Sequence, residues 1–373
     1  MVTRRSFIRR TAAFAAGTAL GLGEARRAVA QGAADPLVAR ALQAGEREIV
    51  IGGGTGSYVD LVKRYFYDPF TAATGIRVSV IGGSYGERVT RLRAMAQVSR
   101  MEWDMVALSA DSLTPEVVPL LRDLGDCGSL PNVTANGIGG ACARHAVLFD
   151  LGGGVLAYSR EAFPDGRPQP ASWADFWNVR AFPGPRTLPN IGTPWWPLMA
   201  ALLADGVAPA SLFPLDLDRA FRKMDEIKPH IAVWWRSGDQ VQQLFRTREV
   251  EMGMSFAGRV LRLRSDGLPV NVVWNGAPLD ASVWAATNGA PHPNAALALL
   301  NFVYTRPEAH AAFIAESLGS TGLRDGIARL APDVQRQQAA YADNWAKIVR
   351  VDPAWLAANQ EATIRRWTEW LSR

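Results

Sequence analysis

The first half of the chain alternates short apolar segments with glycine-rich turns and helical patterns. The segments at residues 49–51, 76–81 and 104–108 each have the apolar character of a strand and end in glycine or small polar residues. Between residues 58 and 70, aromatic and aliphatic side chains recur at three- and four-residue spacing, which predicts an amphipathic helix. Because strand, turn and helix follow one another repeatedly, we expect an α/β fold with a mostly parallel sheet.

A length of 373 residues predicts two domains. The middle third changes character, with a stretch rich in proline and tryptophan between residues 163 and 196. Strand-like sequence returns between residues 270 and 286, as if the chain re-entered the first domain. We expect lobe 1 at residues 46–150 and 268–330, lobe 2 at 151–267, and C-terminal helices at 331–373.

The N-terminus has the three parts of an export signal. An arginine pair, Arg4 and Arg5, precedes a mildly apolar stretch at residues 11–22 and a small-residue cleavage site at residues 28–30. The paired arginines are typical of a twin-arginine signal. The apolar stretch is shorter than the ~20 residues needed to span a bilayer. We therefore predict a twin-arginine-type signal peptide over residues 1–30 and a periplasmic mature protein.

The net charge of the whole chain is +5, but the excess of positive charge lies in the leader. Residues 1–30 hold six arginines and one acid, so the remainder has 34 basic and 34 acidic residues. A mature chain with no net charge lacks the main electrostatic requirement for nucleic-acid binding. We expect no nucleic-acid partner.

The chain has two cysteines, Cys127 and Cys142, separated by a glycine-rich segment. In an oxidising compartment we predict a disulfide that closes a loop of about fifteen residues and stabilises the fold by ~3 kcal/mol. Metal binding is not expected, because the four histidines are scattered and form no ligand pair.

Small polar residues follow the three N-terminal strands at the points where helices begin. They include Thr55, Ser84 and Asp111. Free backbone N–H groups at helix N-termini attract polar ligand atoms, and ligands of open α/β sheets bind outside the carboxyl ends of the strands. The first turn lacks the third glycine of a dinucleotide fingerprint, so no nucleotide cofactor is expected.

The second turn offers an enzymatic alternative. Residues 82–86 read Gly-Gly-Ser-Tyr-Gly between a strand and a helix, which matches the G-x-S-x-G context of an esterase nucleophile at Ser84. A hydrolase also needs a histidine and an oxyanion hole. No His-Gly-Gly-Gly motif precedes the serine. An exported serine hydrolase is the second hypothesis.

Several segments resemble extracellular solute-binding proteins of ABC importers, in particular the spermidine/putrescine-binding branch. The likeness covers essentially the whole mature chain, and its most specific parts are Ser-Trp-Ala-Asp-Phe-Trp and Trp-Trp-Arg-Ser-Gly. The segments are Gly53-Gly54-Thr55, residues 170–177, 188–190, 201–206, 234–238 and 295–307. The resemblance implies a two-lobe type 2 periplasmic-binding-protein fold with a ligand cleft between the lobes.

The resemblance also implies the function and the partners. A small polar solute, with a polyamine as the leading candidate, is captured without chemistry or cofactor and delivered to an ABC permease in the inner membrane. The chain is expected to act as a monomer. In the family, aromatic side chains sandwich the solute and acids meet its ammonium groups. Here Ser282 stands where the polyamine binders carry an acid, and Ala257 stands where the family usually has asparagine.

The predicted contacts combine the turns with these segments. Asp111 and Asp280 are candidate counter-charges, and three tryptophans are candidate apolar walls, with core packing as the alternative for each tryptophan. The full set is Thr55, Ser84, Tyr85, Asp111, Trp195, Trp235, Ser237, Asp280 and Trp284.

Overall fold

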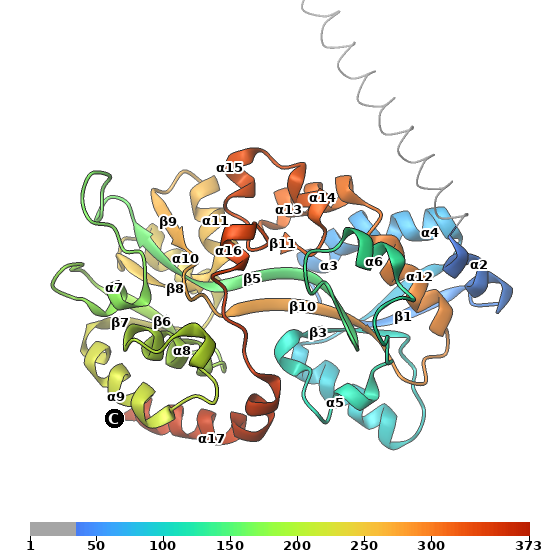
Figure 1. Cartoon of the computed structure of the whole chain (residues 1–373), viewed down its shortest axis with the longest axis horizontal. Helices are drawn as coiled ribbons and strands as arrows, with labels where there is room; N and C mark the ends of the chain where they lie inside the picture. The colour runs from blue at the N-terminus through green and yellow to red at the C-terminus, as the bar shows by residue number, and fades with distance from the viewer. Residues whose placement is uncertain (1–34) are drawn as a thin grey trace, which may run out of the picture.

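Two lobes joined by shared strands make up the computed structural model, which describes residues 35–373 (Figure 1). The predicted signal over residues 1–30 lies outside these residues. Eight of the eleven described strands form one path in the order β2-β1-β3-β10-β5-β8-β6-β7, and β4, β9 and β11 each pair with β5 beside it. The expected α/β class is confirmed, and no helix of the described chain is long and apolar enough to cross a membrane.

Lobe 1 contains the three strands that the sequence predicted. They are parallel neighbours, and the antiparallel β10 and the first half of β5 complete the sheet. The strands are β1 (Glu48–Gly53), β2 (Arg77–Gly82), β3 (Met105–Ser109), β4 (Cys142–Ala143), β5 (Ala146–Ser159), β10 (Leu279–Ala286) and β11 (Ser320–Thr321). The helices are α2 (Pro36–Gln43), α3 (Ser57–Val62), α4 (Asp68–Thr74), α5 (Tyr85–Gln97), α6 (Pro131–Asn136), α12 (Pro293–Val303), α13 (Pro307–Ser317) and α14 (Arg324–Ala328).

Lobe 2 is built around the second half of β5, which pairs with β8 and β9. Its other strands are β6 (Arg186–Pro189), β7 (Ile231–Trp235), β8 (Met252–Phe256) and β9 (Val270–Val273). Its helices are α7 (Trp173–Trp177), α8 (Trp195–Ala204), α9 (Leu217–Ile227), α10 (Gly238–Arg246) and α11 (Ala257–Ser265). After β9, which pairs with β5 in this lobe, the chain continues into β10, which pairs with β3 and with the first half of β5.

The C-terminal segment crosses between the lobes once more. It contains α15 (Pro332–Gln335), α16 (Ala342–Trp345) and α17 (Pro353–Ser372). In Figure 1, α15 and α16 lie near the junction and α17 runs beneath lobe 2. Trp367 and Trp370 of α17 make ring contacts with Phe221 and Trp234. The predicted C-terminal helices therefore belong in part to the core of lobe 2.

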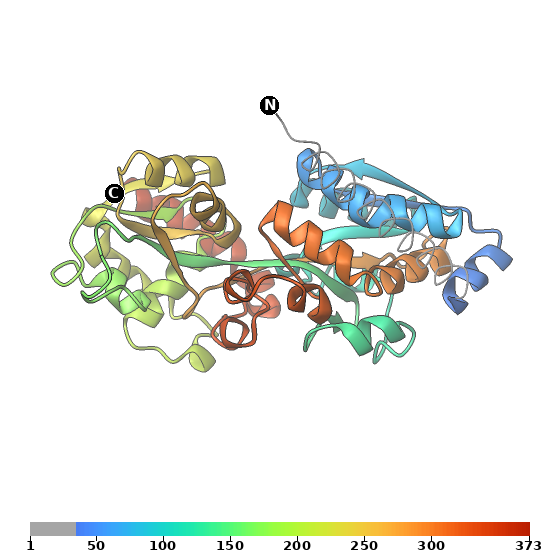
Figure 2. The same ribbon diagram turned by 90° about the horizontal axis from the view of Figure 1, so that it is seen from above.

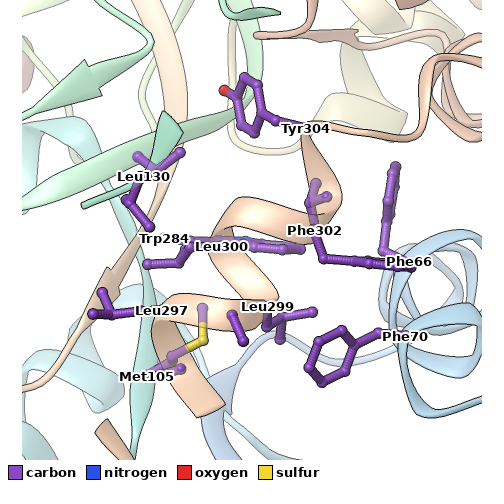
Figure 3. Close-up of a cluster of buried hydrophobic side chains, with 14 of the residues drawn as sticks. Phe66, Phe70, Met105, Leu130, Trp284, Leu297, Leu299, Leu300, Phe302 and Tyr304 are labelled. Atoms are coloured by element: carbon purple, nitrogen blue, oxygen red, sulfur yellow. The ribbon is translucent and has the colours of Figure 1, made fainter. Parts of the chain in front are cut away.

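Each lobe has an aromatic core that holds its sheet in place. In lobe 1, Trp284 stacks on Phe149 with ring centroids 3.9 Å apart, and Phe149 contacts Phe66 edge to face. Figure 3 shows Trp284 with the apolar side chains of α12, among them Leu297 and Leu300. Figure 2 shows the two lobes from above, with β5 running from one to the other. The predicted disulfide between Cys127 and Cys142 is present in lobe 1.

Candidate ligand-binding cleft

A cavity of about 470 Å³ opens between the two lobes. It lies where α3, α5 and the middle of β5 face the start of α11. Lobe 1 and the β5 crossover supply Tyr58, Leu61, Tyr85, Asp150, Leu151, Gly152, Asp280, Ser282, Glu316, Ser317 and Gly319, and lobe 2 supplies Gln242, Phe256, Ala257, Gly258, Arg259 and Arg262. We call this space the cleft cavity.

Two carboxylates on neighbouring strands form its acidic side. Asp150 on β5 and Asp280 on β10 lie within two register positions of each other, since Asp280 pairs with Gly152. Burial and the nearby Asp280 raise the pKa of Asp150 to about 7, and burial raises the pKa of Asp280 to about 6. One Asp150 oxygen, Oδ2, accepts a hydrogen bond from the Tyr58 hydroxyl at 3.1 Å.

The other oxygen of Asp150, Oδ1, is buried and has no hydrogen-bond partner in the described chain. Within residues 35–373, no lysine, arginine or histidine forms an ion pair with Asp150 or Asp280. A buried carboxylate without a counter-charge is unfavourable, and such groups are typical of sites that a ligand completes.

Basic side chains line the opposite side of the cleft cavity. Arg259 and Arg262 both lie on α11, one turn apart. The Arg259 guanidinium donates to Asp239 at 2.8 Å, and Arg262 donates to the backbone carbonyl of Glu316 at 3.0 Å. The second contact joins lobe 2 to lobe 1 at the mouth of the cavity. The cavity is thus acidic on the lobe 1 side and basic on the lobe 2 side.

Aromatic rings form the apolar part of the cavity lining. Tyr58 is 37% exposed and Tyr85 is 44% exposed, although most large apolar side chains of this protein are buried. Phe256 approaches from lobe 2 at the end of β8 and packs against Trp196 with ring centroids 5.6 Å apart. Exposed rings in a concave, charged site provide an apolar surface for the carbon chain of a ligand.

Of the predicted contacts, Tyr85 and Asp280 line the cleft cavity. Thr55 and Ser84 are exposed and do not line it. Ser237 caps α10, where its hydroxyl accepts from the backbone N–H of Gln240 at 3.2 Å. Asp111 lies outside the cavity lining and accepts a hydrogen bond from a side chain of lobe 2, described next.

The three predicted tryptophans are buried, and none of them lines the cleft cavity. Trp235 is 0% exposed, and its indole N–H donates to the Met254 carbonyl at 2.8 Å, so it belongs to the core of lobe 2. Trp195 is also buried and donates to Asp111 at 3.3 Å, which makes a contact between the lobes. Trp284 stacks in the core of lobe 1 and borders a smaller pocket, described below, rather than the cleft cavity.

Sequence reasoning missed Tyr58, Asp150, Phe256 and both arginines of α11. The sequence contains one indication of Asp150, which is the only charged residue in the long apolar run from Ala146 to Ser159. The other four depend on pairings between distant segments. Tyr58 and Arg262 had no local pattern that distinguished them from ordinary surface residues, whereas Phe256 and Arg259 flank Ala257 in the segment that was compared with the family.

Ser84 is a helix cap rather than a nucleophile. Its side chain accepts from the backbone N–H of Glu87, and the Glu87 carboxylate in turn accepts from the hydroxyl and backbone N–H of Ser84. Within residues 35–373, Asp104 and His292 form an acid–histidine pair. Asp104 immediately precedes β3, whereas Ser84 follows β2. Both strands run parallel to β1, so the start of β3 and the end of β2 lie at opposite ends of the strands. At ~3.3 Å per residue, Asp104 and His292 lie about 15 Å from Ser84. The serine hydrolase hypothesis therefore has no support.

Comparison with known proteins identifies the class that this fold and cleft define. Residues 66–346 match the family described as bacterial extracellular solute-binding proteins, and the chain belongs to that family. The expected two-lobe fold and solute-binding function are confirmed. Members of this family bind solutes rather than act as enzymes.

Three relatives show how close the likeness is. The gamma-aminobutyric acid-binding protein of Pseudomonas aeruginosa is 28% identical over 341 residues, which cover 90% of this chain and 94% of that protein. The spermidine/putrescine-binding periplasmic protein of Escherichia coli is 26% identical over 178 residues, 46% of this chain and 48% of that protein. The open unliganded structure of PBP AttC from Agrobacterium tumefaciens matches with a TM-score of 0.76 and 32% identity, over 87% of this chain and 100% of that one.

Proposed function

We propose that this protein is the periplasmic substrate-binding component of an ABC importer, and that its ligand is a small amine that also carries a carboxylate, similar in chemistry to γ-aminobutyrate. Family membership supports capture of a solute, and the N-terminal sequence supports export. In this role the protein, acting as a monomer, delivers the solute to a permease in the inner membrane.

The unpaired carboxylates of the cleft cavity carry the assignment of the amine. Asp150 has one oxygen without a partner, and Asp280 lies on the adjacent strand. An ammonium group bound between them supplies both the missing hydrogen bonds and the missing positive charge. The rings of Tyr58 and Tyr85 lie beside this position and cover the adjoining methylene groups.

The basic side of the cavity argues for a carboxylate on the same ligand. A linear polyamine would bring positive charge toward Arg259 and Arg262, which like-charge repulsion disfavours. An amino acid adds a negative charge, which these arginines attract, to the amine that the carboxylates of lobe 1 bind. The near full-length likeness to a γ-aminobutyric acid-binding protein supports this choice over the polyamine that the sequence favoured. A diamine remains the second candidate, because Asp150 and Asp280 both lack a counter-charge in the described chain.

Isothermal titration calorimetry at pH 8 with the ligand-free mature protein tests this function. We expect γ-aminobutyrate to bind, and n-butyrate, which lacks the amine, to bind at least tenfold more weakly. Asp280→Asn should weaken γ-aminobutyrate binding by at least tenfold, because it removes a charged partner. Asp343→Asn, at an exposed acid of α16, is the matched control and should leave the affinity unchanged.

The outcomes separate the candidates. Tighter binding of putrescine than of γ-aminobutyrate would assign the protein to diamines. Equal binding of n-butyrate and γ-aminobutyrate would refute the assignment of Asp150 and Asp280 to an ammonium group. A thermal-shift series with the same compounds checks the ranking, since a ligand that binds the folded state raises the melting temperature by mass action.

A further inference from the structure

A second, smaller pocket of about 200 Å³ adjoins the cleft cavity inside lobe 1. It shares Tyr58, Tyr85 and Ser282 with the cleft cavity, so these three side chains form the boundary between the two spaces. Beyond them the walls are apolar and consist mainly of Val59, Val62, Val80 and Trp284. We call this space the lobe 1 pocket.

Arg88 is the one charged side chain of the described chain that lines the lobe 1 pocket. It lies on α5, is only 5% exposed, and its guanidinium carbon lies 4.2 Å from the ring centre of Tyr85. The guanidinium donates to the backbone carbonyls of Ser84 and Ala107. These two bonds use two of its five N–H groups, and the Tyr85 side chain is a further partner. No carboxylate within residues 35–373 forms an ion pair with Arg88.

A second donor lies beside Arg88. Tyr67 is 4% exposed, lines the same pocket, and its hydroxyl has no hydrogen-bond partner in the described chain. Arg88 is close enough to Tyr67 to lower the pKa of the phenol, against the larger raising effect of burial. No acidic side chain lines the pocket. An apolar pocket with a buried cation and a free hydroxyl lacks one component, an anion that accepts both hydrogen bonds.

We propose that the lobe 1 pocket binds the carboxylate of the ligand through Arg88 and Tyr67. This inference rests on the proposed function, in which the ammonium group lies at Asp150 and Asp280. The carbon chain then passes between Tyr58 and Tyr85, the residues that border both spaces. Lobe 1 alone holds the two charged ends, and lobe 2 covers the ligand on closure.

The arginines of lobe 2 are less suited to this contact. Arg259 is already paired with Asp239, and Arg262 donates to the Glu316 carbonyl across the cleft. Both are exposed, and water weakens an ion pair at an exposed site. Arg88 is buried, planar and unpaired, which suits two-point recognition of a carboxylate. The basic side of lobe 2 contributes to the attraction of the ligand, whereas Arg88 specifies its carboxylate.

The test compares γ-aminobutyrate with n-butylamine, which lacks only the carboxylate. For the unmodified mature chain at pH 8, we expect calorimetry to give a Kd at least tenfold lower for γ-aminobutyrate. In Arg88→Met that preference should vanish, with the Kd for γ-aminobutyrate raised about 10- to 100-fold and the Kd for n-butylamine unchanged. Arg88→Lys should restore part of the preference, because it keeps the charge but loses the planar fork.

Tyr67→Phe provides the second variant, since it removes one hydroxyl and preserves the ring. We expect it to raise the Kd for γ-aminobutyrate about 3- to 10-fold, again without effect on n-butylamine. Arg91→Met, at an exposed arginine of the same helix, is the matched control and should behave as the unmodified chain.

The possible failures are distinguishable. If the unmodified chain binds neither amine, the proposed function is wrong. If it prefers γ-aminobutyrate and both Arg88→Met and Tyr67→Phe keep the full preference, the proposed function stands and the lobe 1 pocket is not the carboxylate site. If Arg88→Met does not fold, the result for Tyr67→Phe decides the question.

Discussion

Replacing Asp150 by asparagine should stabilise the ligand-free protein while it weakens ligand binding. The carboxylate is half-buried, has one unpaired oxygen and lies near Asp280, which together raise its pKa from 3.8 to about 7. In the unfolded chain the same group has a pKa near 3.9. The folded state therefore holds a proton more tightly, and ionisation of Asp150 opposes folding.

The sign and size of the effect follow from this difference. Between about pH 4 and pH 7 the folded state binds more protons than the unfolded state, so the free energy of unfolding falls as the pH rises. A pKa difference of about 3 corresponds to ~4 kcal/mol for a site without solvent. Asp150 borders an open cavity, so water reduces this free energy. We therefore expect Asp150→Asn to raise the free energy of unfolding by about 1 to 2 kcal/mol at pH 8 and by almost nothing at pH 4.

Urea denaturation of ligand-free protein, followed by circular dichroism at pH 4.5 and pH 8, measures this gain. Tyr58 can still donate to the oxygen of the asparagine amide, so the local geometry should persist. Asp343→Asn, at an exposed acid, is the control and should show no gain at either pH. An Asp150→Asn variant that is less stable than the unmodified chain at pH 8 would refute the reasoning, as would unchanged affinity for γ-aminobutyrate.

The remaining predictions concern residues outside the cleft cavity. Replacing Cys127 and Cys142 by serine should lower the free energy of unfolding by ~3 kcal/mol, measured by urea denaturation, and leave the Kd for γ-aminobutyrate unchanged. Trp235→Ala should cost ~3 to 5 kcal/mol by the same assay, because it leaves a cavity in the core of lobe 2. Trp235→Phe should fold and keep its affinity for γ-aminobutyrate within about twofold. A large loss of affinity in that variant would indicate that Trp235 contacts the ligand.

The parts of the fold that the sequence predicted are those set by local patterns. The strands ending near Gly53, Gly82 and Ser109 were predicted because each apolar run stops at a turn that begins a helix. The extent of lobe 2 was less predictable, since β9 is assigned to it only by pairing with a strand more than a hundred residues earlier. Such long-range pairing leaves no local signal.

The candidate site shows the same division more sharply. Asp280 and Tyr85 were predicted from motifs and line the cleft cavity, whereas Trp235 was predicted from a motif and is buried. A tryptophan at the end of a strand can be buried in a core or line a pocket, so the sequence does not distinguish these two positions. Arg88 looked like one of several arginines on an exposed helix, and its burial results from the packing of α5 on β3.

The strand β5 has a consequence for how the two lobes communicate. Asp150, Leu151 and Gly152 line the cleft cavity, Gly153 still pairs with β10 of lobe 1, and Gly154 is the first residue that pairs with β8 of lobe 2. Both glycines are closely packed, because a Cβ at Gly154 would lie 2.8 Å from the Trp196 ring and one at Gly153 would lie 3.1 Å from the Pro278 carbonyl oxygen. In the proposed function, a solute at Asp150 contacts the one strand that pairs with β10 of lobe 1 and with β8 of lobe 2. We expect the angle between the lobes to differ between the filled and the empty cavity, which would let a membrane partner distinguish loaded from empty copies without touching the solute.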